Sequence, residues 1–195
     1  MSDELVIRHC APTMANIKTA NLFTGNFADR QEMLDEVRSL NNRLKNKGIR
    51  VLALQYEKGR GLIYVYRPGR LSKDLQDCKA CQLLKQCGYP DLDENICLRH
   101  LIQKLEGEGE FPHEIGLFLG YPPDDVEGFI NRRKSWKLCG FWKVYGDVEK
   151  ASKQFARFRK CTDLYQKQWL MGKSIEHLTV AGKAVSDQLN ISIVT

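Results

Sequence analysis

The sequence predicts an α+β fold: a mainly helical single domain around a small, mainly antiparallel sheet. Two β-branched and aromatic runs, IRVLALQY and LIYVY, are separated by Glu-Lys-Gly-Arg-Gly, which indicates a hairpin at residues 49–67. A third run, LCGFWKVY, predicts one more strand near residues 138–145. Most other apolar residues recur at three- and four-residue spacing, which is typical of amphipathic helices.

Length and composition favour one globular unit. The chain has 195 residues, of which 43% are hydrophobic and 28% charged, and it contains no linker or repeat. We expect a single compact domain over residues 1–195: an N-terminal helical segment (1–48), the hairpin with further helices (49–135), and a strand with a long helix (136–195). No apolar run approaches the roughly 20 residues that span a bilayer, so no membrane partner is expected. Because the acidic N-terminus does not resemble a signal peptide, we expect a cytoplasmic protein.

The N-terminal segment begins with helix signals. Ser2 precedes Asp3 and Glu4, which is typical of a helix start. Pro12 disfavours helix at Ala11 and predicts a break there. A second short helix is then expected through Ile17 and Leu22.

Asp29 and Glu32 predict the start of the next helix by capping-box spacing, and Gly48 predicts its end. Pro68 closes the hairpin that follows. Two helices are expected over residues 71–87 and 92–105, with Gly88 capping the first. Asp147 predicts the start of a long helix, and NISIVT at the C-terminus predicts one more strand. The buried stripe expected on that long helix consists of Val148, Ala151, Phe155, Phe158, Tyr165 and Trp169.

The stretch HEIGLFLGYPPDDVEGFI, residues 113–130, has the pattern of a helix-turn-helix. A DNA-reading motif needs the first turn of its second helix to enter the major groove. Here that turn carries Asp124 and Asp125, which stabilise a helix N-terminus but repel phosphates. A structural helix pair is therefore favoured, and nucleic-acid binding is the disfavoured alternative. In that alternative Arg132, Arg133 and Lys134 would contact the nucleic-acid backbone.

Two constellations contain cysteine and histidine. Cys78 and Cys81, then Cys97 and His100, have the spacing of a four-ligand zinc site, but both pairs lie in helical patterns where cysteine commonly packs as a small apolar residue. No cofactor can be assigned. Seven cysteines without an export signal are expected to be thiols.

The second constellation is RHCAPT, in which Arg8 and His9 flank Cys10. Cationic neighbours can shift a thiol toward thiolate, so His9 and Cys10 are candidates for catalysis as well as binding. The candidate ligand-binding residues are Arg8, His9, Cys10, Lys18 and Asn21. The alternative is a structural bend with no chemistry.

The net charge is +6, and Lys150, Lys153, Arg157, Arg159 and Lys160 form a basic stretch on the long helix. This stretch is a solvated face or a dock for an acidic protein partner. Glycine-rich nucleotide loops and a serine nucleophile elbow are absent from the sequence, which disfavours the common nucleotide-binding and hydrolase classes.

Three segments together, RHCAPTMANIKTANLF, FPHEIGLFLGYPPDDVEGFI and GFWKVYGDVEKA, resemble an uncharacterised bacterial family of unknown function, found largely in anaerobic Gram-positive organisms. The likeness spans almost the whole chain and implies no activity. The family pattern includes His9–Cys10 and residues 113–130 but not the Cys78–Cys81 pair, which weakens the zinc interpretation. It also implies a place near flavodoxin and iron-uptake genes, which fits an acidic redox partner.

The leading hypothesis from the sequence is an accessory protein that binds a small ligand, a metal species or a redox partner through the His9/Cys10 region. The alternatives are a nucleic-acid-binding or regulatory module that uses residues 113–130, and a thiol-dependent enzyme of unassigned substrate.

Overall fold

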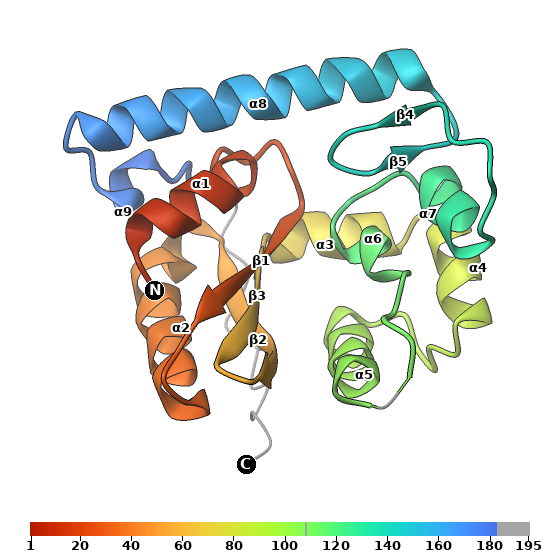
Figure 1. Cartoon of the computed structure of the whole chain (residues 1–195), viewed down its shortest axis with the longest axis horizontal. Helices are drawn as coiled ribbons and strands as arrows, with labels where there is room; N and C mark the ends of the chain where they lie inside the picture. The colour runs from red at the N-terminus through yellow and green to blue at the C-terminus, as the bar shows by residue number, and fades with distance from the viewer. Residues whose placement is uncertain (108, 183–195) are drawn as a thin grey trace.

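The computed structural model describes residues 1–107 and 109–182, and its elements confirm the α+β class (Figure 1). A three-stranded antiparallel sheet with the order β1–β3–β2 lies at the centre. A separate pair of very short strands, β4 and β5, lies under one end of the long helix. The predicted C-terminal strand NISIVT lies outside the described residues. The strands are β1 (Ala20–Asn26), β2 (Arg50–Glu57), β3 (Arg60–Tyr66), β4 (Leu138–Cys139) and β5 (Lys143–Val144).

The predicted hairpin is confirmed. Strands β2 and β3 pair from Arg50 opposite Tyr66 to Glu57 opposite Arg60. Lys58 and Gly59 form the turn with φ of 49° and 79°. Two consecutive residues at positive φ give the tight turn that matches strand twist, which is why a glycine stands there.

The central strand β3 is buried on both faces. Ile63 and Val65 pack with α1 and α2, whereas Tyr64 and Tyr66 pack with α3, α5 and α6 on the other face. Because alternate side chains of a strand point to opposite faces, one strand serves both cores. These helices are α1 (Asp3–Met14), α2 (Arg30–Leu44), α3 (Pro68–Leu75), α5 (Glu94–Glu106) and α6 (Ile115–Phe118).

The long helix α8 (Val148–Leu170) crosses the top of the molecule in Figure 1 and confirms the predicted helix after Asp147. The Asp147 side chain accepts a hydrogen bond from the Lys150 amide at 2.9 Å, which caps the first turn. Phe155 and Phe158 pack against Trp142 and Val144 of the β4–β5 region. The other half of α8 lies along α1 and α9 (Ile175–Leu178).

Two predictions for the N-terminal segment are wrong. Helix α1 does not break at Ala11 but continues through Pro12 to Met14, and the Ala15 amide still bonds the Ala11 carbonyl at 2.8 Å. A proline this near the end removes one hydrogen bond and leaves little helix to disturb. The second helix expected through Ile17 and Leu22 is replaced by β1, which pairs along its whole length with β3.

Two further predictions need correction. The helix expected over residues 71–87 is two helices, α3 and α4 (Cys78–Gln86), because the Asp77 side chain accepts from the amides of Lys79 and Ala80 and starts a new helix. Gly88 follows α4 with φ of 86°, as a helix-ending glycine does. The strand expected near 138–145 folds back as β4 and β5 and does not join the central sheet.

The remaining elements are η1 (Lys45–Lys47) and α7 (Pro123–Ile130). None of the helices in the described residues is sufficiently long and apolar to cross a membrane.

Candidate functional site

The helix pair expected at residues 113–130 is present as α6 and α7. Gly120, with φ of 72°, ends the first helix, and Pro123 opens the second. The two helices approach closely at Gly116, where an added Cβ would lie 2.8 Å from a methyl group of Val126. The sequence therefore specifies a tight helix pair by small residues and turn geometry.

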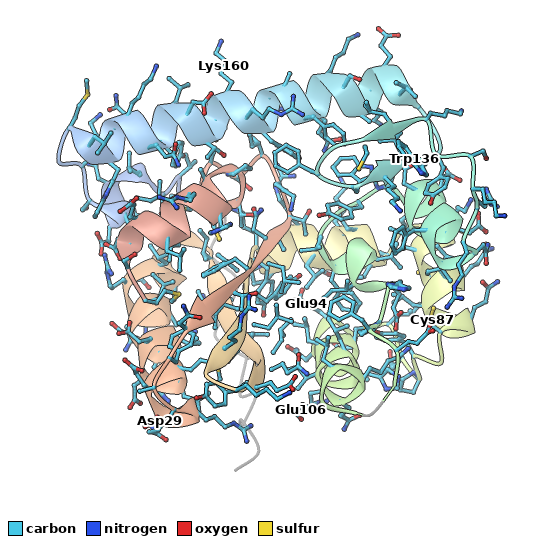
Figure 2. All side chains as sticks on the ribbon, in the orientation of Figure 1. Asp29, Cys87, Glu94, Glu106, Trp136 and Lys160 are labelled. Carbon is cyan, nitrogen blue, oxygen red and sulfur yellow. The ribbon has the colours of Figure 1, made fainter. Side chains whose placement is uncertain are left out.

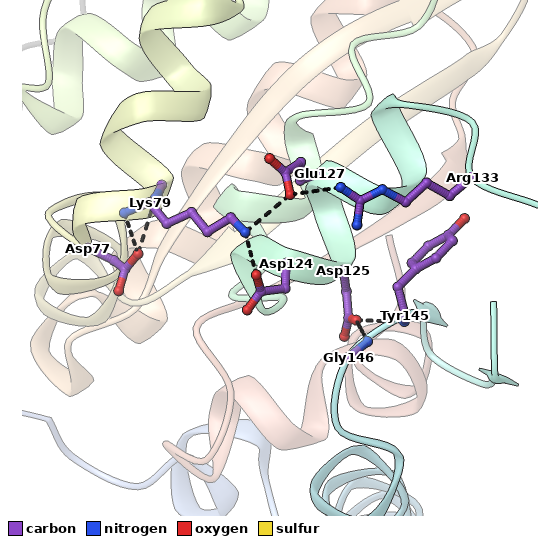
Figure 3. Close-up of polar contacts among 9 residues, drawn as sticks. Asp77, Lys79, Asp124, Asp125, Glu127, Arg133, Tyr145 and Gly146 are labelled. Carbon is purple, nitrogen blue, oxygen red and sulfur yellow. Dashed lines mark hydrogen bonds and ion pairs between the residues drawn. The ribbon is translucent and has the colours of Figure 1, made fainter. Parts of the chain in front are cut away.

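The first turn of α7 is held against the rest of the protein (Figure 3). Asp124 pairs with Lys79 of α4, and Lys79 also lies 3.1 Å from Glu127. Arg133 contacts the same Glu127 at 3.3 Å. The first turn of α7, which a DNA-reading motif would insert into the groove, thus presents carboxylates that are engaged with Lys79 and Arg133.

Asp125 fastens α7 to the β4–β5 hairpin. This carboxylate is 4% exposed and accepts hydrogen bonds from the Trp142 indole at 2.8 Å, the Tyr145 amide at 2.7 Å and the Gly146 amide at 2.8 Å. A buried carboxylate is stable only when its oxygens are satisfied in this manner. Asp125 therefore joins α7 to both the hairpin and the segment that follows it.

A cleft of about 360 Å³ opens between the α6–α7 segment and the hairpin. Trp142 stacks on Tyr121 with 4.7 Å between ring centroids, and His113 meets the Phe129 ring at 4.9 Å with the two planes at 90°. Phe111 and Phe129 are 48% and 37% exposed. The cleft lining comprises Phe111, His113, Ile115, Gly116, Leu119, Tyr121, Asp125, Val126, Phe129, Trp142 and Lys143.

Lys143 provides the positive charge of the cleft. Its ammonium lies 5.3 Å from the centroid of the Phe129 ring, within the range of a cation–π contact. Within residues 1–107 and 109–182, no carboxylate pairs with this ammonium. The cleft therefore combines aromatic walls, one satisfied carboxylate and one available cation.

The N-terminal candidates face in different directions. Arg8 is exposed and pairs with Glu4 at 2.8 Å, and the exposed His9 ring stacks on Phe23. Partial burial, and then the charge of Arg8, lower the pKa of His9. Cys10 is fully buried in the core between α1, α2 and the sheet, and burial raises the pKa of its thiol far above the ordinary value. A thiolate is disfavoured in such surroundings.

Lys18 and Asn21 also lie apart from each other in their contacts, and Lys18 alone contacts a residue that lines the cleft. Lys18 is buried, donates to the Ala20 carbonyl, and its ammonium lies 5.3 Å from the centroid of the Tyr121 ring. Burial lowers the pKa of Lys18 to about 7. Asn21 accepts a hydrogen bond from the Thr13 hydroxyl at 2.7 Å. Lys18 itself does not line the cleft.

Three of the four zinc-ligand candidates contact neighbours outside the proposed ligand set. The Cys81 thiol donates to the Leu75 carbonyl at 3.1 Å and the Cys97 thiol to the Asp91 carbonyl at 3.2 Å. Cys78 is exposed, and the His100 ring lies edge-on to Tyr89. In the part of the chain that the structure describes, no three His, Cys, Asp or Glu side chains gather into a group that could hold a metal ion.

Two of the three basic residues after α7 are paired. Arg132 bonds Glu110 at 2.9 Å and Arg133 pairs with Glu127, while Lys134 is exposed. Any phosphate contact by these arginines would compete with a local carboxylate.

Sequence reasoning missed the aromatic cleft. Its signal was present as FPHE, EGFI and GFWKVY, three aromatic-containing stretches. Aromatic residues at such positions usually belong to a core, and only the folded structure shows Phe111 and Phe129 half-exposed around a hollow.

Comparison with known proteins places the chain in a family. A stretch of 71 residues is 38% identical to "Probable tRNA pseudouridine synthase D" of Thermococcus gammatolerans, covering 36% of this chain and 15% of that protein. No solved structure matches the chain. Residues 6–179 match the family described as "Protein of unknown function (DUF3793)", as the resemblance of the three segments implied. The chain therefore belongs to this family of unknown function.

Proposed function

We propose that this protein is a binding protein that takes a small molecule with a planar, apolar body into the cleft beside Trp142. The observation that carries the proposal is the hollow of about 360 Å³ on which aromatic rings from two separate chain segments converge. Pockets for small molecules are mostly apolar, carry a few placed polar groups, and have volumes of roughly 300–1,000 Å³.

The size of the cleft suits a body of about two fused rings. An engineered apolar cavity of about 150 Å³ binds benzene, and this cleft has somewhat more than twice that volume. Ligand binding would also cover Phe111 and Phe129, which otherwise leave much of their ring surface in water. Removing apolar surface from water contributes about 25 cal/mol per Å².

The test uses 2-naphthamide, a neutral two-ring probe, with binding followed by ligand-observed NMR and calorimetry. For a probe of this size we expect a dissociation constant of roughly 0.1–1 mM. Phe129→Ala should weaken binding about tenfold, because it removes an exposed wall ring. Trp136→Ala is the matched control, since Trp136 is an exposed aromatic residue, like Phe129, but does not line the cleft. Absence of binding to the unmodified protein, or equal losses in the two variants, would contradict the proposal.

We also propose a cytoplasmic location and an acidic protein partner. In support of the location, all seven cysteines are free. In support of the partner, α8 exposes a line of cations at helical spacing, and Figure 2 shows Lys160 projecting away from the rest of the molecule. The line comprises Lys150, Lys153, Arg157, Lys160 and Lys167. Binding to such a partner should weaken steeply with salt and on replacing Arg157 and Lys160 by glutamine.

A further inference from the structure

Building on the proposed function, we infer that the cleft selects planar aromatic carboxylates, with the ammonium of Lys143 as the ion-pair partner of the ligand. The proposal names the ligand class of the cleft and a specificity-determining residue.

The fold fixes the backbone that carries Lys143. This residue is the first of β5 and pairs with Cys139 of β4, while the next residue, Val144, is fully buried. Because successive strand residues point to opposite faces, burial of Val144 turns Lys143 outward to the cleft. Asp125 holds the same hairpin through the Trp142 indole and two backbone amides. The ammonium therefore projects from an anchored strand and lies over the Phe129 ring.

Four cations in the segments near the cleft already have partners. Lys79 pairs with Asp124 and Glu127, Arg132 with Glu110, and Arg133 with Glu127. Lys137 donates to the Gly146 carbonyl at 3.1 Å. Lys143 is the cation among the residues that line the cleft, and it has no carboxylate partner in the described part of the chain, so a ligand can reach its charge without breaking an ion pair.

The carboxylate of the cleft does not favour a cationic ligand. One oxygen of Asp125 accepts from the Trp142 indole, and the other accepts from two amides. A ligand cation would have to compete with these three donors for a charge that they already stabilise. The available charge is the positive one on Lys143, so electrostatic complementarity favours an anion.

The aromatic walls favour a flat ligand body that carries this anion. Tyr121 and Trp142 are stacked with 28° between their planes, and Phe129 presents its ring next to Lys143. Aromatic rings associate in offset-stacked or edge-to-face arrangements, which a flat ligand can adopt with such walls. A carboxylate attached directly to the ring system would lie at the mouth beside the ammonium while the rings occupy the apolar interior.

The experiment compares three probes of one shape and different charge: 2-naphthoate, 2-naphthamide and the 2-naphthylmethylammonium ion. Binding to the full chain is measured by calorimetry at low ionic strength. We expect 2-naphthoate to bind about three- to fivefold more tightly than the amide, as for an ion pair at a solvent-accessible site, and the cation to bind most weakly. Added salt should reduce the preference for naphthoate and leave amide binding nearly unchanged.

Variants test whether the preference for naphthoate over the amide comes from Lys143. Lys143→Gln should reduce the ratio of naphthoate to amide affinity to about one, and Lys143→Arg should preserve it. Lys134→Gln is the matched control, because Lys134 is an exposed cation in the segment after α7 that does not line the cleft. Equal binding of the three probes would overturn the inference but leave the proposed function intact. A naphthoate preference that survives Lys143→Gln would overturn the role of Lys143, and failure of every probe to bind would overturn both proposals.

Discussion

Burial changes the chemistry of two side chains in the N-terminal element. Cys10 is fully buried and the pKa of its thiol is raised, while the pKa of Lys18 is lowered to about 7. Both shifts have the same main cause, because a low-polarity interior disfavours whichever form is charged. His9 and Cys10 are adjacent in the sequence but lie in different surroundings: His9 is exposed to water and Cys10 is buried in the core. Participation of His9 and Cys10 in ligand binding stays a prediction from the sequence.

Thiol alkylation tests whether Cys10 is reactive in the native protein. In the native protein we expect Cys10 to react with iodoacetamide at least about 100-fold more slowly than Cys78 and Cys139, because it must wait for opening of the core. The exposed thiols of Cys78 and Cys139 serve as internal controls. Site-resolved mass spectrometry over a time course gives the three rates. A Cys10 rate equal to or above those of the exposed thiols would restore the nucleophile hypothesis.

Lys18 should make stability depend on pH. Its pKa is about 7 in the folded protein and ordinarily 10.5, so between these values the unfolded chain binds a proton that the folded chain lacks. The free energy of unfolding should therefore rise as the pH rises from about 7 toward 10. In Lys18→Met this contribution disappears, and we expect the variant to be more stable than the parent at pH 7, by up to a few kcal/mol.

Urea unfolding at pH 7 and 9.5 checks the prediction for Lys18, with the exposed Lys134→Met as control. The informative quantity is the difference between parent and variant, because other groups titrate in both proteins. A difference that is the same at both pH values would show that Lys18 is charged throughout the range.

At the scale of elements, the sequence predicted correctly those helices and strands whose ends are set by residues close by in the chain. The Asp29 side chain bonds the Glu32 amide and starts α2, and Asp147 starts α8 in the same way. The hairpin was recognisable from its own two strands and the turn at Lys58–Gly59. Strand β1 was missed because residues 20–26, with two asparagines and a glycine, have weak strand preference and become a strand by pairing with β3.

The aromatic cleft could not be predicted from the sequence because it is formed by residues from separate segments of the chain. The walls of the cleft come from residues 111–129 and 142–143, which are joined by the bonds of Asp125 and by the stacking of Tyr121 on Trp142. The sequence showed acidic residues at the start of α7 and suggested helix caps. Asp124 instead forms an ion pair and Asp125 a buried anchor, and these roles depend on partners 45 and 17 positions away.

The contact between α7 and the chain after β5 predicts the effect of a small substitution. An added Cβ at Gly128 would lie 2.6 Å from the Tyr145 ring, so Gly128→Ala should push the two segments apart. We expect a loss of about 1–3 kcal/mol in the free energy of unfolding, typical of overpacking. Gly69→Ala in α3 is the control, since no atom lies within 4 Å of the added group and alanine favours helix. Urea denaturation should therefore show opposite signs for the two variants, and a neutral Gly128→Ala would contradict the close approach.

At the scale of the whole molecule, Arg67 connects segments that are far apart in the sequence. Its buried guanidinium donates to the carbonyls of Thr13 and Met14 at the end of α1, to Lys47 after α2, and to Val180 beyond α9. Burial lowers the pKa of Arg67 to about 10. A planar fork of five donors suits this task, because the acceptors lie in different directions around the group.

Replacement of Arg67 by lysine should therefore be costly despite the conserved charge. An ammonium has three donors on a single nitrogen and cannot reach all four carbonyls, so we expect a loss of about 2–4 kcal/mol. Guanidinium chloride unfolding measures the change. Arg70→Lys is the matched control: Arg70 is exposed and bonds only to Asn16 among the described residues, so its loss should be below about 1 kcal/mol. Equal losses in the two variants would show that Arg67 does not act as a connector.

The assignment of binding to the aromatic cleft is tested most directly by an NMR titration of the ¹⁵N-labelled protein with 2-naphthoate. We expect the largest shifts at the Trp142 indole and at the amides of residues 111–129 and 142–146, with the amides of α1 nearly unchanged. Shifts centred on His9 and Cys10, or the absence of saturable shifts at the cleft, would contradict the account.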